Sequence, residues 1–411
     1  MRALVLGKGG REHALSWSLV AGGATVFAMP GSDGIATVAE SVAGDSTSTV
    51  DVLDAVRRLH IDLVVPGPEE PLVRGIAEDL RAQGIAVFGP DRLGAQIEAS
   101  KAHAKTLMRA AGIPTAAASL CQDFGAVEQT LAVHPDRTVV KADGLAAGKG
   151  VIVADDAAGA RRAARRLIGQ YGSVLLEERM RGPEVSLIAI CHGRDYRLLP
   201  FARDHKRLLT GDLGPNTGGM GAFAPVPTTS VTAEECAERT IGPLLKLLDD
   251  RGTPYSGALY AGLILTERGP KVLEYNVRFG DPETEVLLPA IAGSILPWLD
   301  GAARGRLPSE APQVVRNALG VVLAAQGYPD EPESGAEIAG LEAARAAGAL
   351  VFHAGTRRLG DVWQVAGGRV VCVVGQGEGP SEARDNAYAA ASFIRFTGAQ
   401  WREDIGRSWD V

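Results

Sequence analysis

Cysteine is scarce in this 411-residue sequence, and its few thiols follow no pattern. The four cysteines lie far apart, without CxxC spacing, and are typical of buried or incidental thiols in a reducing compartment. The seven histidines form no pair at i, i+2 or i, i+4, so a structural zinc is not indicated.

Long apolar runs and an excess of positive charge are also missing. No apolar run approaches membrane-spanning length, and the start at Met1–Leu6 runs into glycines too early for a signal peptide. A net charge of −7 argues against a general nucleic-acid or anionic-membrane surface. We therefore expect a cytoplasmic monomer with neither partner, whose phosphate sites are built locally from particular lysines, arginines and glycines.

Several common catalytic motifs are absent. The chain has neither a nucleophile elbow nor a Cys–His signature, so covalent catalysis through a side chain is not indicated. Near the N-terminus, Gly7–Glu12 joins a short strand to a helix start, but Glu12 replaces the third glycine of a dinucleotide fingerprint, and the next strand ends in Met29 rather than an acidic residue. What remains is a phosphate-sized pocket at a helix N-terminus, flanked by Arg11 and Glu12.

The length predicts two to four domains, because 411 residues exceed one hydrophobic core. In the first 100 residues, short apolar strands alternate with helices, as in a doubly wound parallel sheet. The turn at Pro66–Leu72 follows one of these strands, where open α/β sheets bind ligands. Glu69 in this turn is a candidate for sugar hydroxyls, although a solvated carboxylate in a proline-rich loop explains it equally well.

The strongest motif is Lys141–Gly150, a glycine-rich segment between two β-branched runs. Glycine has no Cβ, so backbone N–H groups of such a loop can closely approach an anion. Lys141 and Lys149 bracket the loop and would meet a polyphosphate from two sides. The segment lacks the Gly-Lys-Ser/Thr helix start of the P-loop and favours a strand–loop–strand nucleotide clamp, the alternative being a hairpin with solvated lysines.

A second constellation lies at Lys271–Glu283. Because strand residues two apart point to one face, Glu274, Asn276 and Arg278 are predicted to project together. A carboxylate, an amide oxygen and a guanidinium suit a divalent cation and phosphate oxygens. The alternative is an ordinary polar face of a half-buried strand.

Two further segments have the character of ligand-binding loops. A strand ending at Glu177 continues into a charged hinge that can offer backbone groups to an adenine edge, and Glu184 can then bond ribose hydroxyls. The segment Gly214–Gly221 contains too many glycines for a helix or an interior strand, and we expect a loop whose backbone touches a ligand.

Together these motifs resemble the phosphoribosylamine–glycine ligases, or glycinamide ribonucleotide synthetases, of the ATP-grasp superfamily. The resemblance covers the whole chain and is most specific at Gly214–Ala222 (GPNTGGMGA) and Arg278–Thr284 (RFGDPET). It implies an α/β protein with an N-terminal doubly wound domain (1–100), an ATP-grasp domain of two α+β subdomains (101–326, with the nucleotide clamp at about 115–187) and a small C-terminal α+β domain (327–411).

The resemblance also implies a reaction and its cofactors. Glycine would be joined to 5-phosphoribosylamine with ATP and Mg²⁺ or Mn²⁺, giving glycinamide ribonucleotide, ADP and phosphate. A carboxylate is a poor electrophile because its leaving group would be oxide. Transfer of the γ-phosphoryl group to glycine makes a glycyl phosphate that the sugar amine can attack, and this transfer depends mainly on positioning and charge neutralisation.

Site roles follow from the matching motifs. Catalytic roles are implied for Lys149, Asp212 and Arg278, with Asp212 holding the glycine ammonium. Contacts with ATP are implied for Lys105, Lys141, Gly144, Leu145, Ala146, Gly148, Lys149, Glu177, Glu178, Met180 and Glu184. The metal ligands would be Glu274 and Asn276. Contacts with the other substrates are implied for Gly9, Gly10, Arg11, Glu12, Glu69, Asp212, Gly214, Asn216, Arg278 and Asp281.

The sequence departs from the family pattern at Lys8, Arg179 and Glu285, and in a shortened segment between Arg166 and Val174. A charge pair between Lys8 and Glu285 would compensate two of these changes, or the two residues would mark another ATP-grasp carboxylate–amine ligase with a different substrate. A non-catalytic nucleotide-binding protein would instead require loss of a phosphate lysine or metal ligand. All of these residues are present: Lys141, Lys149, Glu274, Asn276 and Arg278.

Overall fold

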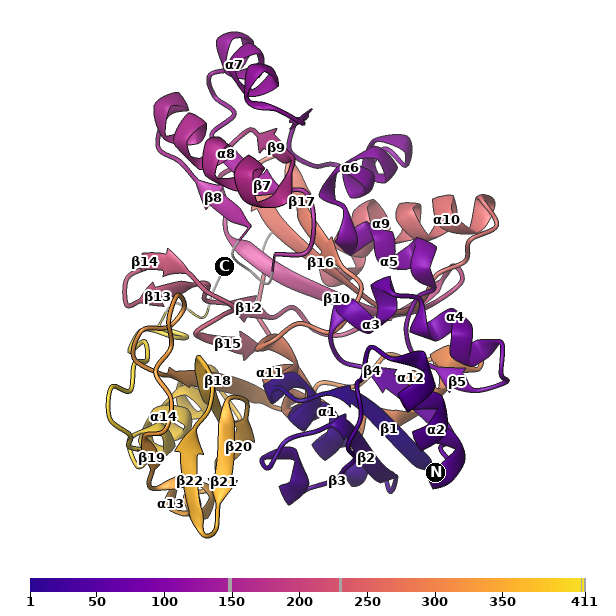
Figure 1. Ribbon diagram of the computed structural model, residues 1–411, viewed down its shortest axis with the longest axis vertical. Helices are drawn as coiled ribbons and strands as arrows, with labels where there is room; N and C mark the ends of the chain where they lie inside the picture. Colours follow the sequence, from indigo (N-terminus) through magenta and orange to yellow (C-terminus); the bar gives the residue numbers. More distant parts are fainter. Residues whose placement is uncertain (147–149, 229–230, 408, 410–411) are drawn as a thin grey trace.

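The structure is a computed structural model that describes residues 1–146, 150–228, 231–407 and 409. Figure 1 shows a clamp of purple and magenta elements at the top, an indigo N-terminal sheet at the lower right and orange to yellow C-terminal elements at the lower left. None of the helices within the described ranges is both long and apolar enough to cross a membrane.

The N-terminal region is a parallel sheet of five strands in the order β3–β2–β1–β4–β5. The strands are β1 (Arg2–Gly7), β2 (Thr25–Pro30), β3 (Glu40–Ser41), β4 (Leu63–Pro66) and β5 (Ala86–Val87). The accompanying helices are α1 (Gly10–Ala21), η1 (Ile35–Thr37), α2 (Thr49–Leu59), α3 (Glu69–Val73), α4 (Ile76–Arg81) and α5 (Arg92–Ala99). Because β1 lies inside the sheet with strands added on both sides, the predicted doubly wound topology is present.

The clamp is an antiparallel sheet in the order β6–β9–β7–β8, covered by two helices. Its elements are β6 (Ala118–Cys121), α7 (Phe124–Val133), β7 (Val139–Ala142), β8 (Val151–Val153), α8 (Ala157–Tyr171) and β9 (Val174–Glu177). Asp123 and Asp156 cap the two helices through their side chains. The clamp has its own apolar core, which includes Val127, Leu131 and Leu167.

Below the clamp lies a four-stranded antiparallel sheet, called the central sheet below, in the order β11–β10–β16–β17 (Figure 1). Its strands are β10 (Glu184–His192), β11 (Asp195–Leu198), β16 (Ser256–Thr266) and β17 (Gly269–Asn276). Helices that contact this sheet are α5, α6 (Lys101–Ala110), α9 (Ala233–Thr240) and α12 (Leu296–Ala303), and α10 (Gly242–Asp250) packs on α9 and α6.

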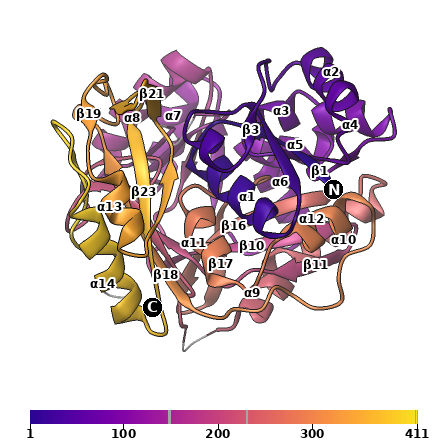
Figure 2. The ribbon, with the colours of Figure 1, turned by 90° about the horizontal axis from the view of Figure 1, so that it is seen from below.

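A third sheet, in the order β12–β15–β18–β23–β20, is antiparallel throughout. Its strands are β12 (Arg203–Asp204), β15 (Gly221–Ala224), β18 (Asn317–Ala324), β20 (Leu350–His353) and β23 (Arg369–Gly377). The remaining elements of this part are β13 (Arg207–Leu209), β14 (Leu213–Asn216), α11 (Glu283–Ala290), β19 (Glu337–Ile338), α13 (Leu341–Ala346), β21 (Thr356–Leu359), β22 (Val362–Val365) and α14 (Pro380–Ala391). Helix α11 contacts both α1 and this sheet, and therefore connects the N- and C-terminal regions (Figure 2).

The predicted fold class is confirmed, whereas the domain boundaries near residues 100 and 326 stay predictions. One detail differs from expectation. The segment Gly214–Gly221 is not loop throughout, because its start lies in β14 and Gly221 begins β15. Glycine is required at the start of β15, where a Cβ would lie 2.5 Å from the carbonyl oxygen of Gly320 on β18.

Candidate active site

Two buried lysines bind one carboxylate between the clamp and α6. Lys105 Nζ is 3.1 Å from Glu177 Oε1, and Lys141 Nζ is 3.0 Å from Glu177 Oε2. Lys141 also donates to the carbonyl oxygen of Leu273 on β17 at 2.8 Å, which ties the clamp to the central sheet. Burial lowers the pKa of Lys105 to about 8, although Glu177 opposes the shift. The Glu177 side chain is thus occupied by the two lysines, and its backbone lies between β6 and β7 in the clamp sheet. The adenine contact of this segment stays a prediction.

The predicted polar face of the second constellation is present. Glu274 and Asn276 lie on β17, half-buried, while the intervening Tyr275 is buried. Arg278, just beyond the strand, donates from NH2 to Asn276 Oδ1 at 3.2 Å. The three predicted side chains therefore lie together.

Positive charge surrounds Glu274. Burial acts to raise the pKa of this carboxyl, but Lys206, Lys141, Lys101 and Arg278 together hold it below its usual value. Lys141, Lys206 and Arg278 also pair with Glu177, Glu184 and Glu69, so these cations form an ion-pair network beside Glu274.

The donor set at this face also fits a divalent cation. Glu274 and Asn276 offer hard oxygen ligands, and Mg²⁺ typically uses one or two protein carboxylates together with substrate phosphates and water. In the described part of the chain, no group of three or more His, Cys, Asp or Glu residues is arranged to hold a metal. A cation at Glu274 and Asn276 would therefore complete its coordination with phosphate and water oxygens.

Arg278 joins this face to the N-terminal domain. Its Nε lies 3.2 Å from Glu69 Oε2 at the start of α3, and its NH2 lies 3.1 Å from Glu98 Oε1 on α5. Burial acts to raise the pKa of Glu69, but Arg278 and Arg11 hold it below its usual value. Burial raises the pKa of Glu98 to about 7, with Arg278 opposing. Glu98 was not predicted for the site. Its position on the same helix face as the small, buried residues Gly94 and Ala95 was a sequence signal for a buried acid.

The predicted phosphate pocket at α1 is shaped by Glu12. Its Oε2 accepts from the backbone N–H of Gly9 at 2.6 Å, and its Oε1 pairs with Arg11 Nε at 2.6 Å. A Cβ on Gly67 would lie 2.1 Å from Glu12 Oε1, so glycine is required there at the end of β4. Arg11 NH1 reaches the carbonyl oxygen of Phe279 at 3.1 Å. The predicted substrate residues Gly9, Gly10, Arg11, Glu12 and Glu69 thus lie at the carboxyl edge of the parallel sheet.

A hollow lies between the central sheet and β12. Its polar lining comes from Glu184, Ser186, Asp204, Lys206 and Tyr260. Only Glu184 was predicted for the site, and its carboxylate is 3.6 Å from Lys206 Nζ. Asp204 Oδ1 is buried without a hydrogen-bond partner in the described chain, and burial raises the pKa of this carboxyl. The run Arg203–Arg207 of charges just before the glycine-rich segment was the available signal.

The other predicted ATP contacts lie at the clamp. Gly144 has φ +146° and accepts from Lys101 Nζ through its carbonyl oxygen at 3.1 Å. Leu145 and Ala146 follow it, and Gly148 and Lys149 lie outside the described residues. After β9, Glu178 Oε1 accepts from the backbone N–H of Ala117 at 3.2 Å, and Met180 is half-buried.

The hairpin β13–β14 carries Asp212, Gly214 and Asn216. Asn216 Nδ2 approaches the carbonyl oxygen of Val151 on β8 at 3.4 Å. Asp212 Oδ1, however, is 2.7 Å from NH1 of the buried Arg402. The Asp212 side chain is otherwise exposed, and its role in holding the glycine ammonium stays a prediction.

The departures at Lys8 and Glu285 do not form the suggested charge pair. Lys8 is exposed, whereas Glu285, on α11, is 1% exposed and lies beside Asp281. Asp281, a predicted substrate residue, instead pairs with Arg369 NH1 at 2.9 Å.

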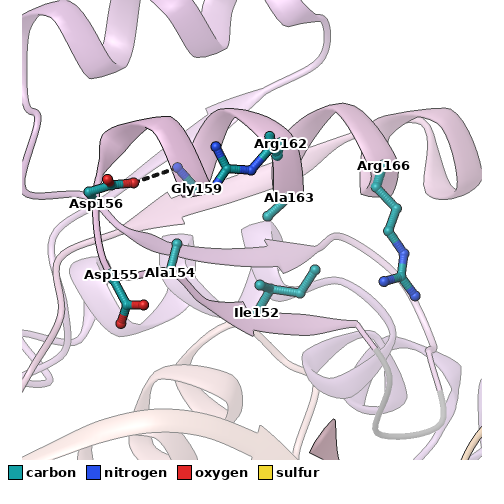
Figure 3. Close-up of a pocket in the computed structure, with 8 residues that line it drawn as sticks. All are labelled: Ile152, Ala154, Asp155, Asp156, Gly159, Arg162, Ala163 and Arg166. Carbon is teal, nitrogen blue, oxygen red and sulfur yellow. Dashed lines mark hydrogen bonds between the residues drawn. The ribbon is translucent and has the colours of Figure 1, made fainter.

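The clamp also carries a wider hollow, and none of the residues that line it was predicted for the site (Figure 3). It is lined by Ile152, Ala154, Asp155, Asp156, Gly159, Arg162, Ala163 and Arg166. Asp156 Oδ1 accepts from the backbone N–H of Gly159 at 2.6 Å, which is a helix cap. The two arginines are exposed, so the hollow has the character of a surface depression between β8 and α8.

An antiparallel clamp sheet tied through Lys141 to a second antiparallel sheet that carries Glu274 and Asn276 is the arrangement of an ATP-grasp protein. Three family models cover most of the chain: the phosphoribosylglycinamide synthetase N domain (1–98), ATP-grasp (A) domain (99–284) and C domain (318–408). The chain therefore belongs to the phosphoribosylglycinamide synthetase family.

Relatives along the full length agree. The phosphoribosylamine–glycine ligase of Streptomyces coelicolor is 45% identical over 98% of both chains, and that of Mesorhizobium japonicum is 43% identical over 99% of this chain and 98% of its own. The crystal structure of the Thermotoga maritima phosphoribosylamine–glycine ligase superposes with a TM-score of 0.88 at 35% identity, covering 98% of this chain and 100% of the other. The predicted family resemblance is confirmed.

More distant neighbours share the fold alone. The biotin carboxylase domain of the Hydrogenobacter thermophilus 2-oxoglutarate carboxylase has a TM-score of 0.74 at 17% identity, over 97% of this chain and 91% of its own. Its agreement over nearly the whole chain supports the three-part architecture, from the N-terminal parallel sheet to the C-terminal region.

Proposed function

We propose that this enzyme ligates glycine to 5-phosphoribosylamine with cleavage of ATP, giving glycinamide ribonucleotide, ADP and phosphate. The observation that carries the proposal is the position of Arg278. One guanidinium contacts Asn276 on the ATP-grasp face, and Glu69 and Glu98 of the N-terminal domain. A group placed between the two sites can neutralise a phosphoryl group in transit and also orient the sugar substrate.

The clamp side of the site suits ATP. Lys141 and Lys101 contribute positive charge near Glu274, and the hinge after β9 can hold the adenine while Glu184 bonds the ribose. Mg²⁺ or Mn²⁺ held by Glu274 and Asn276 would supply charge neutralisation at the phosphoryl oxygens. Phosphoryl transfer to the glycine carboxylate then gives the glycyl phosphate intermediate.

The N-terminal side suits the sugar phosphate. Gly10 and Arg11 lie in the first turn of α1, whose N–H groups and dipole attract a phosphate, while the N–H of Gly9 donates to Glu12. Glu69 is held ionised by Arg278 and Arg11 and can accept hydrogen bonds from ribose hydroxyls. Asp212, whose exposed carboxylate pairs with Arg402 through Oδ1, stays the candidate for holding the glycine ammonium. The monomeric state and the cytoplasmic location stay predictions.

The experiment that tests this function is ADP release from the purified protein with ATP and magnesium. Glycine and freshly generated phosphoribosylamine are added separately and together. We expect ADP, and glycinamide ribonucleotide detected by mass, only when both substrates are present. ADP release that does not depend on either substrate would reject this substrate assignment and favour another carboxylate–amine ligase.

The metal assignment has its own test. Glu274→Ala should abolish turnover without unfolding the protein, because the substitution removes a half-buried ligand and creates little cavity on a polar face. A matched control is Glu267→Ala, an exposed acid in the turn before β17. Full activity of the Glu274 variant with magnesium would remove Glu274 from the metal site.

A further inference from the structure

Glu285 is a buried acid that the proposed chemistry does not use. It lies on α11, is 1% exposed, and its Oε2 has no hydrogen-bond donor in the described part of the chain. Its Oε1 lies only 2.6 Å from the position that a Cβ on Gly10 would occupy, so the carboxyl group packs directly against the start of α1. A buried carboxylate oxygen without a donor would be costly if the group were ionised, because nothing replaces the hydration lost at that atom.

The neighbour of Glu285 explains how this cost is avoided. Its carboxyl group lies beside that of Asp281, four residues earlier, and both face the start of α1, where a Cβ on Gly10 would lie 2.6 Å from Glu285 Oε1 and one on Gly9 would lie 3.7 Å from Asp281 Oδ2. Asp281 Oδ1 is 2.9 Å from Arg369 NH1, and Arg11 adds a second positive charge nearby. Burial acts to raise the pKa of Asp281, but Arg369 and Arg11 hold it below its usual value. The charge of the pair therefore resides on Asp281.

The other surroundings of Glu285 keep its own carboxyl neutral. Burial, and then Asp281, raise its pKa well above the usual range, with Arg369 opposing. From β23, Cys372 also faces the acid, and burial and Glu285 raise the pKa of that thiol. From α1, Gly10 packs against the carboxyl group of Glu285. Arg369 is a cation that faces Glu285, and it is already bound to Asp281.

We propose that Glu285 carries the single proton of this carboxyl pair at neutral pH and donates it in a hydrogen bond to Asp281. The bond holds the Asp281 carboxylate between Arg369 and the start of α1, where a Cβ on Gly9 would be 3.7 Å from Asp281 Oδ2. Glu285 is therefore a positioning residue for the sugar-phosphate site, and this part of the inference rests on the proposed function.

A kinetic test uses two variants of Glu285. Glu285→Leu removes the donor and should raise the KM for phosphoribosylamine about tenfold, with a smaller change in kcat. Loss of a hydrogen bond to a charged group typically weakens binding by about tenfold. Glu285→Gln keeps an N–H donor and should restore most of the affinity at pH 7.5. The proposal is overturned if the two variants have the same KM.

A second test is independent of the substrate. Because the folded-state pKa of Glu285 is raised above the usual 4.5, the folded protein retains a proton that the unfolded chain releases. The free energy of unfolding therefore falls as the pH rises from about 4.5 to the folded-state pKa of Glu285. Within this range the unfolding constant increases by up to about tenfold per pH unit. Glu285→Gln should lack this component, so its advantage over the parent in urea unfolding should grow from pH 5 to pH 8.

The control for this comparison is Glu310→Gln, which removes the same charge from an exposed acid. It should follow the parent across the pH range. An unchanged difference between parent and Glu285→Gln from pH 5 to pH 8 would refute the shared proton, whatever the substrate of the enzyme is. A growing difference with no effect on KM would instead confine Glu285 to stability and reject its positioning role.

Discussion

Lys141 on β7 and Glu177 on β9 form a buried ion pair at 3.0 Å within the clamp. The same lysine reaches across to the carbonyl oxygen of Leu273 on β17. Because β17 also carries Glu274 and Asn276, the pair fixes the clamp relative to the proposed metal ligands. Lys105 shares Glu177 from α6, so the carboxylate is held from two elements.

We predict that Lys141→Met lowers kcat by about 100- to 1,000-fold, as loss of a charge at an electrostatic site typically does. It should also destabilise the protein by about 1–3 kcal/mol, less than the roughly 3–5 kcal/mol of a fully broken buried pair, because Lys105 remains. Steady-state kinetics and urea unfolding measure both effects. Lys246→Met, which breaks an exposed pair on α10, is the control. Wild-type kcat in the Lys141 variant would contradict the assignment.

The sequence predicted those site features that depend on local pattern. The alternation of side chains along a strand was enough to place Glu274, Asn276 and Arg278 on one face. The succession of strand, turn and helix was enough to place Glu69 at an edge of the parallel sheet. The glycines around Lys141 indicated the clamp for the same reason. These motifs concern residues that are neighbours in sequence, where spacing and geometry are directly related.

The missed features depend on contacts between distant segments. Arg402 is separated from Asp212 by 190 residues, and no local pattern indicates that this aspartate has a partner. Glu98 is 180 residues from Arg278 by number, yet the two side chains are 3.1 Å apart. Likewise, the suggested pairing of Lys8 with Glu285 failed because burial of an acid beside another acid cannot be read from charge alone.

Gly67 provides a test of the proposed sugar-phosphate site. A Cβ there would lie 2.1 Å from Glu12 Oε1, so Gly67→Ala should displace Glu12 from the N–H of Gly9. We expect the free energy of unfolding to fall by about 1–3 kcal/mol, as is typical of overpacking. The KM for phosphoribosylamine should rise, while the KM for ATP should stay unchanged. Gly169→Ala on α8, where a Cβ meets nothing within 4 Å, should be neutral or stabilising. Equal KM shifts for both substrates would argue against this location.

A buried histidine pair should make the protein sensitive to acid. The backbone N–H of His353 donates to His13 Nδ1 at 2.9 Å, between β20 and α1. Burial, then Arg345, lowers the pKa of His13 to about 3, and burial, then His13, lowers that of His353 to about 3. The unfolded chain therefore binds protons from about pH 6.5 downward that the folded protein does not, so stability falls as pH decreases from about 6.5 toward 3.

The expected loss is about 1.4 kcal/mol per pH unit for each histidine within that window. His13→Gln keeps an oxygen that can accept from His353 and should make the pH dependence of urea unfolding about half as steep between pH 6 and pH 4.5. His103→Gln, at an exposed position on α6, should leave the slope unchanged. If the slope of the His13 variant equals that of the parent, the histidine pair is not the source of acid sensitivity.

Arg402 is predicted to hold the hairpin β13–β14 in place. Its side chain is 1% exposed and pairs with Asp212 and Asp404, each at 2.7 Å, while Asp404 Oδ2 accepts from the N–H of Gly211. Arg402→Met should cost about 2–4 kcal/mol, because it leaves the largely buried Asp404 without a counter-charge, and should increase proteolytic cleavage at 207–216. Arg402→Lys should not restore protection, since one ammonium cannot make the bidentate contact. Arg58→Met, on the exposed face of α2, is the control, and unchanged cleavage in Arg402→Met would show that the hairpin is held by other contacts.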